Sequence, residues 1–353
     1  MAFNAELAQR QLIQMYQQAY MQLLNTIITK QARGNATAFY GVLIRDIERI
    51  LGQLNFATDT WAQTALPKIY RQGIAIVNQT LVQAGQRPGL TLGLAGVHRR
   101  SIEVIAQNFT MNMRDATQYV GRHIRDEWRR TTLEVITGRE ATGDTLREAK
   151  QNFLHRIGEQ GLEAFRDVRG RHWRLDAYAD MAVRSTGREA TNVAQLNQIR
   201  EVGNDLVQFT EHSNPCEICA PLEGRVYSIS GEDPRYPALD IAFGEGYANI
   251  HPNCRHSLRA YIPDLDDAPR ETLQKSNRSF ERDPRSQAEK ERYEAEQSRR
   301  AAQRATRLQW EKYRAWLPDD TPTTLSAFGR MKAAGSERYN ELQQLFRQVR
   351  AEQ

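Results

Sequence analysis

The sequence has few cysteines and no long apolar run. A membrane-spanning helix needs about 18 or more consecutive apolar residues, and none of the 353 residues belongs to such a stretch. The three cysteines are an odd number, which excludes a fully paired disulfide framework. Residues 1–6 carry no basic segment followed by an apolar run, so we expect no secretory signal and synthesis in the cytoplasm.

The chain also lacks a strong charge of one sign. It contains 48 basic and 43 acidic residues, a formal net charge of +5. So small an excess is compatible with contact to nucleic acid but does not require it. The length allows two or three cooperative units.

Apolar residues at helical spacing dominate the first two hundred residues. They predict helices over the ranges 5–54 with a break at 33–35, 58–84, 97–137, 144–159 and 175–203. Pro67 predicts a kink or break in the second of these. The polar face of the third is rich in arginine, which we interpret as a solvated face rather than a phosphate-binding stripe. These arginines are Arg99, Arg100, Arg114, Arg122, Arg125, Arg129 and Arg130.

The texture changes after residue 204. Short runs rich in β-branched and aromatic residues predict strands at 206–210, 225–229 and 258–262. The range 287–317 is charged and has no wide apolar stripe, which predicts a helix held by charge pairs that would dock, if at all, on a partner. One or two helices are expected within 324–353.

These elements predict a mainly α protein with a small α+β zinc-binding module at about 205–262. The module belongs to a core segment over 166–265. An elongated multi-helix region over 1–165 precedes this segment, and a charged helical tail over 266–353 follows it.

All three cysteines fall in that module. Cys216 and Cys219 are separated by two residues, and so are His251 and Cys254. Two such pairs suit a tetrahedral zinc site, because each tight turn aims two side chains at one point. We therefore predict a structural zinc ion held by these four residues, in a segment with little core of its own. His212 and His256 flank the module and could replace a ligand or support the ligands from outside, as could Arg255. Arg255 and Arg259 could offset the negative charge.

Other chemistries fit less well. A redox CxxC should lie at a strand-to-helix turn, whereas residues 220–224 lead into a turn and a strand; a cluster of thiols without metal stays the alternative. A zinc deaminase needs an upstream H-x-E, which is absent after His155 and His172. A His-Asn-His nuclease would use His251 within the zinc pair itself. No Glu-x-Glu loop follows suitable strands, and no Walker loop is present. We predict no catalytic residues.

The segment 168–264 contains a set of characteristic strings besides His212 and the CxxC. They are Gly170–Met181 (GRHWRLDAYADM), Arg184–Thr186 (RST), Gly203–Val207 (GNDLV), Gly224–Ser228 (GRVYS) and His251–Leu258 (HPNCRHSL). Through these residues the segment resembles the phage minor capsid protein family, which is related to the Mu F-like and SPP1-type head morphogenesis proteins. The last string is the most specific. A looser resemblance extends over most of the chain.

The resemblance implies a low-copy head protein of a tailed bacteriophage, located in the virion near the portal and inner shell. It implies partners among portal and capsid proteins, packaged double-stranded DNA and other copies of the chain, but no membrane. The expected role is head assembly and DNA packaging or ejection, without enzymatic activity. The alternative is a DNA-binding protein or enzyme delivered with the genome. Candidate contact residues for a partner or DNA are Arg171, Trp173, Arg174 and Arg184.

Overall fold

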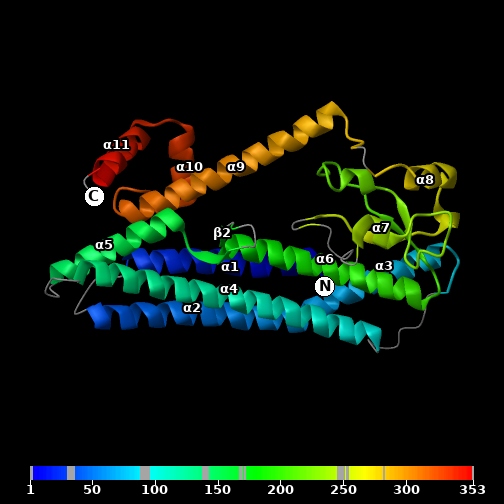
Figure 1. Ribbon diagram of the computed structural model, residues 1–353, viewed down its shortest axis with the longest axis horizontal. Coiled ribbons are helices and arrows are strands. Elements are labelled where there is room, and N and C mark those ends of the chain that lie inside the picture. Colours follow the sequence, from blue (N-terminus) through cyan, green and yellow to red (C-terminus); the bar gives the residue numbers. More distant parts are fainter. Residues whose placement is uncertain are drawn as a thin grey trace. The chain divides into compact units, whose positions relative to one another are not determined.

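The structure is a computed structural model, and it is mainly helical with two small sheets (Figure 1). It describes residues 3–29, 36–87, 96–136, 143–166, 170, 172–244, 251, 254–280 and 283–351. The helices are α1 (Ala5–Thr29), α2 (Ala36–Thr64), α3 (Leu66–Gln83), α4 (Val97–Ile136), α5 (Gly143–Gln160), α6 (Leu175–Glu201), α7 (Leu239–Phe243), α8 (Pro269–Ser276), α9 (Gln287–Trp316), α10 (Leu325–Ala333) and α11 (Glu337–Ala351). The strands are β1 (Glu163–Arg166), β2 (His172–Arg174), β3 (Leu206–Phe209), β4 (Val226–Ser228) and β5 (Leu258–Ala260). Within these residues, no helix is both long and apolar enough to span a membrane.

The long helix predicted at 97–137 is confirmed as α4, and the predicted break at Pro67 is confirmed as well. Pro67 lies in the first turn of α3, where a missing N–H leaves no helical hydrogen bond unmade. The helix start expected at residue 58 was wrong, because α2 runs on to Thr64. Its buried stripe continues through Leu54, Thr58 and Trp61. The break expected at 33–35 and the end expected at residue 137 for the third predicted helix lie outside the described residues.

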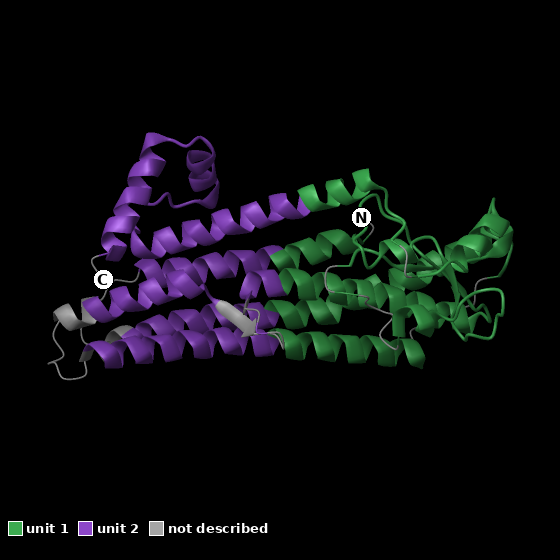
Figure 2. Cartoon of the chain, turned by 45° about the horizontal axis from the view of Figure 1, so that its top comes forward, with its two compact units in different colours: residues 1–13, 57–113, 179–295 green, residues 14–56, 114–178, 296–353 purple. Residues whose placement is uncertain are grey.

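The chain forms two compact units, each assembled from three separate segments (Figure 2). Unit 1 contains residues 1–13, 57–113 and 179–295, and unit 2 contains residues 14–56, 114–178 and 296–353. The predicted division of the chain into three consecutive segments, with boundaries after residues 165 and 265, stays a prediction.

Unit 1 contains the antiparallel sheet β4-β3-β5, and all three of its strands were predicted. The sheet shares a buried core with α3 and α6, which supply Val77, Leu81, Leu196 and Ile199. Two of the cysteines, Cys219 and Cys254, belong to the same core. The expectation of a segment with little core was therefore wrong, because α3, which is distant in sequence, and α6, which precedes β3, both pack on the sheet.

Residues after the last strand also pack on this sheet. The backbone N–H of Val226 in β4 donates to Ser276 Oγ of α8 at 2.9 Å. Arg225 donates to the carbonyl of Ser279 at 2.9 Å, and its guanidinium lies 4.3 Å from the ring centre of Phe280. The range 269–280 thus completes the unit that contains the cysteines.

Unit 2 contains the hairpin β1–β2, which was not predicted, and a second apolar core near the C-terminus. That core is formed by the end of α9 with α10 and α11, through Trp310, Tyr313, Phe328 and Phe346 among others. The last turns of α9 therefore pack within unit 2, because amphipathic α10 and α11 supply the apolar partners. For the rest of α9, docking on another protein stays a prediction.

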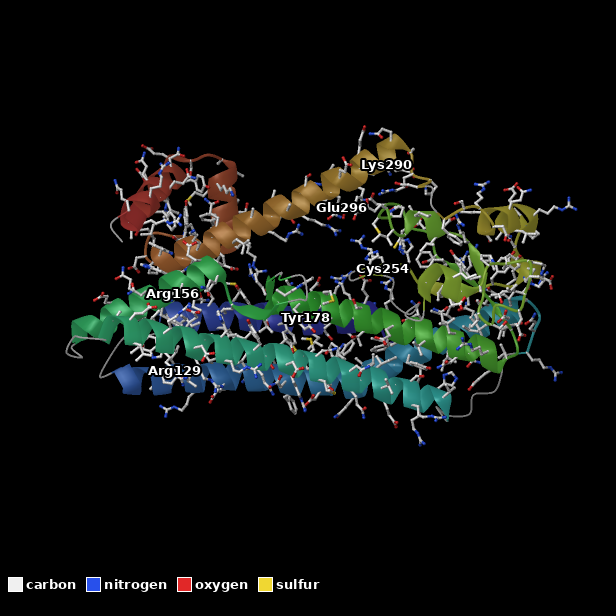
Figure 3. All side chains as sticks on the ribbon, in the orientation of Figure 1. Arg129, Arg156, Tyr178, Cys254, Lys290 and Glu296 are labelled. Atoms are coloured by element: carbon white, nitrogen blue, oxygen red, sulfur yellow. The ribbon has the colours of Figure 1, made fainter. Side chains whose placement is uncertain are left out.

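The arginine-rich face of α4 is partly neutralised by ion pairs in unit 2. Arg125 lies 3.3 Å from Glu48 of α2, and Arg130 lies 2.5 Å from Glu127 of its own helix. Arg156 of α5 lies 2.5 Å from Glu134 of α4 (Figure 3). Arg129 is exposed on the same helix.

Candidate metal centre

The cysteines meet at one end of the three-stranded sheet. β3 pairs antiparallel with both neighbours, and its last residues, Gln208 and Phe209, lie opposite Val226 of β4 and Leu258 of β5. The loop after β3 and the segment before β5 therefore leave the same end of the sheet. The first carries Cys216 and Cys219, and the second carries His251 and Cys254.

Tight turns aim both pairs inward. The backbone N–H of Ala220 donates to the carbonyl of Cys216 at 2.9 Å, and that of Leu222 donates to the carbonyl of Cys219 at 2.9 Å. In the second segment the N–H of Cys254 donates to the carbonyl of His251 at 3.1 Å. These turns bring the two side chains of each pair close enough together to bind one metal ion.

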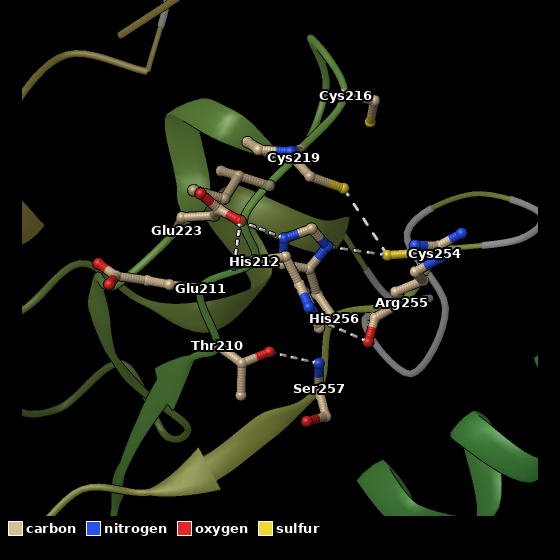
Figure 4. Close-up of polar contacts among 12 residues, drawn as sticks. Thr210, Glu211, His212, Cys216, Cys219, Glu223, Cys254, Arg255, His256 and Ser257 are labelled. Atoms are coloured by element: carbon tan, nitrogen blue, oxygen red, sulfur yellow. Dashed lines mark hydrogen bonds and ion pairs between the residues drawn. The ribbon is translucent and has the colours of Figure 1, made fainter. Parts of the chain in front are cut away.

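The four predicted ligands come together. His251 Nε2 lies 3.2 Å from Cys216 Sγ and 3.1 Å from Cys219 Sγ. Cys219 Sγ lies 3.7 Å from Cys254 Sγ (Figure 4). All three thiols are free of disulfides. Cys219 and Cys254 are buried, whereas Cys216 is partly exposed.

A fifth donor, His256, lies against the cluster. Its Nδ1 is 3.6 Å from Cys254 Sγ, and its Nε2 is 2.6 Å from Glu223 Oε1 (Figure 4). The donor atoms of Cys219, Cys254 and His256 lie within 4.8 Å of one another, as do those of Cys216, Cys219 and His251. His212 sits outside this group, because its Nε2 contacts the carbonyl oxygen of Arg255 at 2.9 Å.

Hydrogen bonds shift the pKa values of the three thiols in different directions. Bonds with Cys219 and His251 lower the pKa of Cys216 to about 4. Bonds with Cys219, His251 and His256 lower the pKa of Cys254 to about 2. Cys219, which bonds to both of the other sulfurs, has a raised pKa. Metal binding requires all three thiols to be deprotonated, and a divalent cation would stabilise the thiolate of Cys219 against this raised pKa.

Two arginines that sequence reasoning did not assign to the site balance its charge. Arg188 of α6 donates to the carbonyl of His256 at 2.8 Å. Burial lowers the pKa of Arg188, and its attraction to Cys254 opposes that shift. Arg285 donates to the carbonyl of Pro215 at 3.2 Å and interacts electrostatically with Cys216. Arg259, which the sequence suggested for this role, donates to Gln208 Oε1 at 3.0 Å instead.

Sequence reasoning also missed Glu223. Its position four residues after Cys219 was the available signal, but an acidic residue at that distance is common in any loop. Arg188 and Arg285 gave no local signal, because α6 and residue 285 reach the cluster only through the tertiary fold.

The donor set fits a metal ion, and thiolate with imidazole suits Zn²⁺ in particular. Zinc bound tetrahedrally at about 2.3 Å to sulfur and about 2.0 Å to nitrogen would separate two sulfurs by about 3.8 Å and sulfur from nitrogen by about 3.6 Å. The distance of 3.7 Å between Cys219 and Cys254 is close to this spacing. The cluster can therefore hold a metal ion.

The residues predicted to contact a partner or DNA do not belong to this cluster. Arg171 lies outside the described residues. Arg174 lies 2.6 Å from Glu311, and Trp173 is partly buried. Arg184 is exposed and lies 2.9 Å from Asp180 in the preceding turn of α6. A contact of these residues with another molecule stays a prediction.

Comparison with known proteins decides the family. The model of the family described as phage minor capsid protein 2 matches residues 4–333. The chain belongs to this family. The resemblance seen in the sequence is thereby confirmed, and it extends well beyond the segment 168–264.

A structural protein of Lactococcus phage LL-H is a relative, 24% identical over 140 residues. The match covers 38% of this chain and 37% of that relative, so the chain spans well under half of the relative's length. No solved structure matches the chain. Together, the family and the relative support a structural role in the virion.

Proposed function

We propose that this chain is a low-copy head protein of a tailed bacteriophage that acts near the portal and inner shell, in head assembly and in DNA packaging or ejection. The family match over residues 4–333 carries the proposal. The expected partners are the portal protein, other capsid proteins, packaged double-stranded DNA and further copies of the chain. The role is structural rather than enzymatic.

Within this role, Cys216, Cys219, His251 and Cys254 hold a zinc ion. Four protein ligands leave no open coordination position, which is the arrangement of a structural rather than a catalytic zinc site. The bound ion would neutralise the thiolates and tie the loop between β3 and β4 to the segment before β5. Arg188 lies close enough to Cys254 for a favourable electrostatic interaction, and Arg285, which also pairs with Asp283, lies close enough to Cys216.

The zinc ion acts as a local brace. Structural zinc contributes on the order of 10 kcal/mol to the folding of small modules that have no other core. Here the sheet also shares its core with α3 and α6. We therefore expect the ion to organise the end of the sheet that bears the cysteines, while the helices fold without it.

Purified virions test the location. Quantitative mass spectrometry should detect the chain in intact particles, in a copy number close to that of the portal protein and far below that of the major capsid protein. Cross-linking before digestion should join it to the portal protein. Absence from particles, or an abundance equal to that of the major capsid protein, contradicts the proposal.

The charge distribution favours a direct contact with DNA as a second function. Unit 2 contains 28 basic and 20 acidic residues, whereas unit 1 contains 20 basic and 23 acidic residues. The positive excess of the whole chain thus resides in unit 2. Binding to duplex DNA that weakens steeply between about 50 and 200 mM salt would support this function. No retention of DNA at the lower salt concentration would refute it.

A further inference from the structure

His256 is held more firmly than a residue that merely borders the cysteines would need to be. Its side chain is buried, with 5% of the residue exposed. The ring stacks on Phe209 at 4.7 Å between centres and 13° between planes, and His212 contacts it edge-on at 4.5 Å. Arg188 binds its backbone carbonyl. The position of the ring is therefore determined from several sides.

Glu223 orients this ring. Its Oε1 lies 2.6 Å from His256 Nε2 and also accepts the backbone N–H of His212 at 2.7 Å. A carboxylate is only an acceptor, so Nε2 carries the hydrogen, and in the neutral ring the lone pair lies on Nδ1. Nδ1 is the atom that faces Cys254 Sγ. A carboxylate that orients an imidazole in this way is the usual partner of a metal-ligating histidine.

The spacing of the second triad also suits coordination. Cys219 and Cys254 are 3.7 Å apart, and Cys254 and His256 are 3.6 Å apart. Tetrahedral zinc requires about 3.8 Å between sulfurs and about 3.6 Å between sulfur and nitrogen. The contacts of His251 with Cys216 and Cys219, at 3.2 and 3.1 Å, are shorter than that.

We propose that His256, oriented by Glu223, is an alternate ligand for the fourth coordination position. The inference rests on the zinc site proposed above. Cys216, Cys219 and Cys254 form the permanent part of the site, and His251 and His256 offer two imidazoles for one remaining place. When His251 is displaced, His256 keeps the ion coordinated.

Metal binding to variants of the full-length chain tests this inference. The variants are His251→Ala, His256→Ala, the double variant, and His123→Ala, on α4 in unit 2, as the control. Zn²⁺ affinity is measured by chelator competition, and Co²⁺ spectra report the tetrahedral field and the thiolate bonds. Each single variant at His251 or His256 should bind one ion with a loss of at most about tenfold, whereas the double variant should lose about a hundredfold more than the product of the single losses. His123→Ala should match the unaltered protein.

Two further measurements identify the ligand directly. In His251→Ala, nitrogen-15 NMR of labelled histidines should show the metal on Nδ1 of His256 and a hydrogen on its Nε2. Glu223→Gln should weaken binding about tenfold in the His251→Ala background and little in the unaltered chain. This milder substitution and the circular dichroism spectra separate ligand loss from misfolding.

The outcomes are distinct. If His251→Ala loses metal as completely as the double variant, His256 is not a ligand and the inference fails. If the effects of the two single substitutions multiply, the two histidines act independently, and it fails as well. If the unaltered chain binds no metal, the zinc site itself is wrong.

Discussion

Nη2 of Arg174, at the end of β2, lies 2.6 Å from Oε1 of Glu311 in α9, although the two residues are 137 positions apart. Both side chains are largely buried, with 16% and 4% exposed. The guanidinium of Arg174 also stacks on the ring of Tyr20 at 4.4 Å, and the Tyr20 hydroxyl donates to Oε2 of Glu311 at 3.0 Å. Arg307 of α9 also belongs to this group, because its Nη1 lies 2.5 Å from Oδ2 of Asp176. This network joins α9 to α1 and α6 within unit 2.

Removing one charge from the network should destabilise unit 2 strongly. Glu311→Leu leaves Arg174 buried without its main partner, and breaking such a pair costs about 3–5 kcal/mol. The double variant Arg174→Met with Glu311→Leu should recover much of that loss, because no unpaired charge remains. Urea denaturation measures the free energy of unfolding of both variants. Arg184→Ala, which breaks an exposed pair with Asp180, is the control and should cost less than about 1 kcal/mol. Equal stability of Glu311→Leu and this control would contradict the role of the network.

The close crossing of α5 and α9 depends on a glycine. A Cβ at Gly158 would lie 2.5 Å from Cβ of Ala315, so Gly158→Ala should force the helices apart and cost about 1–3 kcal/mol. Gly52 of α2 has nothing within 4 Å of such an atom. Gly52→Ala should therefore stabilise the helix by about 0.5–1 kcal/mol. Thermal denaturation compares the two; a neutral Gly158→Ala would show that the crossing can widen freely.

The Asp283–Arg285 pair next to the cysteine loop should make stability depend on acid pH. The hydrogen bond from Arg285 lowers the pKa of Asp283 from its usual 3.8 to about 2. A lowered pKa in the folded state stabilises the protein above pH 3.8, and this contribution is lost as pH falls towards 2. The difference in free energy of unfolding between the unaltered chain and Asp283→Asn should therefore be constant above about pH 5 and shrink below it. A difference that persists at pH 2 would mean that Asp283 acts through something other than its charge.

Loss of the metal should have a local effect. After chelation, or in Cys219→Ser, amide exchange should accelerate in the loop between β3 and β4 and near β5, while α4 keeps its protection. Hydrogen–deuterium exchange with peptide resolution reads both regions at once. The reason is that α3 and α6 still bury the strands. Global unfolding on chelation would show that the zinc ion, and not the shared core, holds unit 1 together.

The order of the elements follows from the sequence because it depends on local patterns. The stripe of α4, the β-branched and aromatic runs of β3, β4 and β5, and the Pro67 break are each set by neighbouring residues. The pairing of Cys216 and Cys219 with His251 and Cys254 was also visible, because ligand spacing is a local property. The hairpin β1–β2 escaped prediction, since its strands are three and four residues long and carry charged residues.

What the sequence alone determined about this protein is therefore its family, its helical class and the residues that could bind a metal. Only the tertiary structure shows which charged residues lie near the cysteines and which pair with residues elsewhere. Arg174 directly precedes α6 and Arg188 lies within it, and the sequence gives no sign of their different partners. Arg188 binds the carbonyl of His256 beside the cysteines, whereas Arg174 pairs with Glu311. The tertiary structure also brings Glu223 to His256 and packs the last turns of α9 against α10 and α11. The physical reason is that burial and pairing depend on residues far apart in the chain, and no local pattern encodes which of them meet.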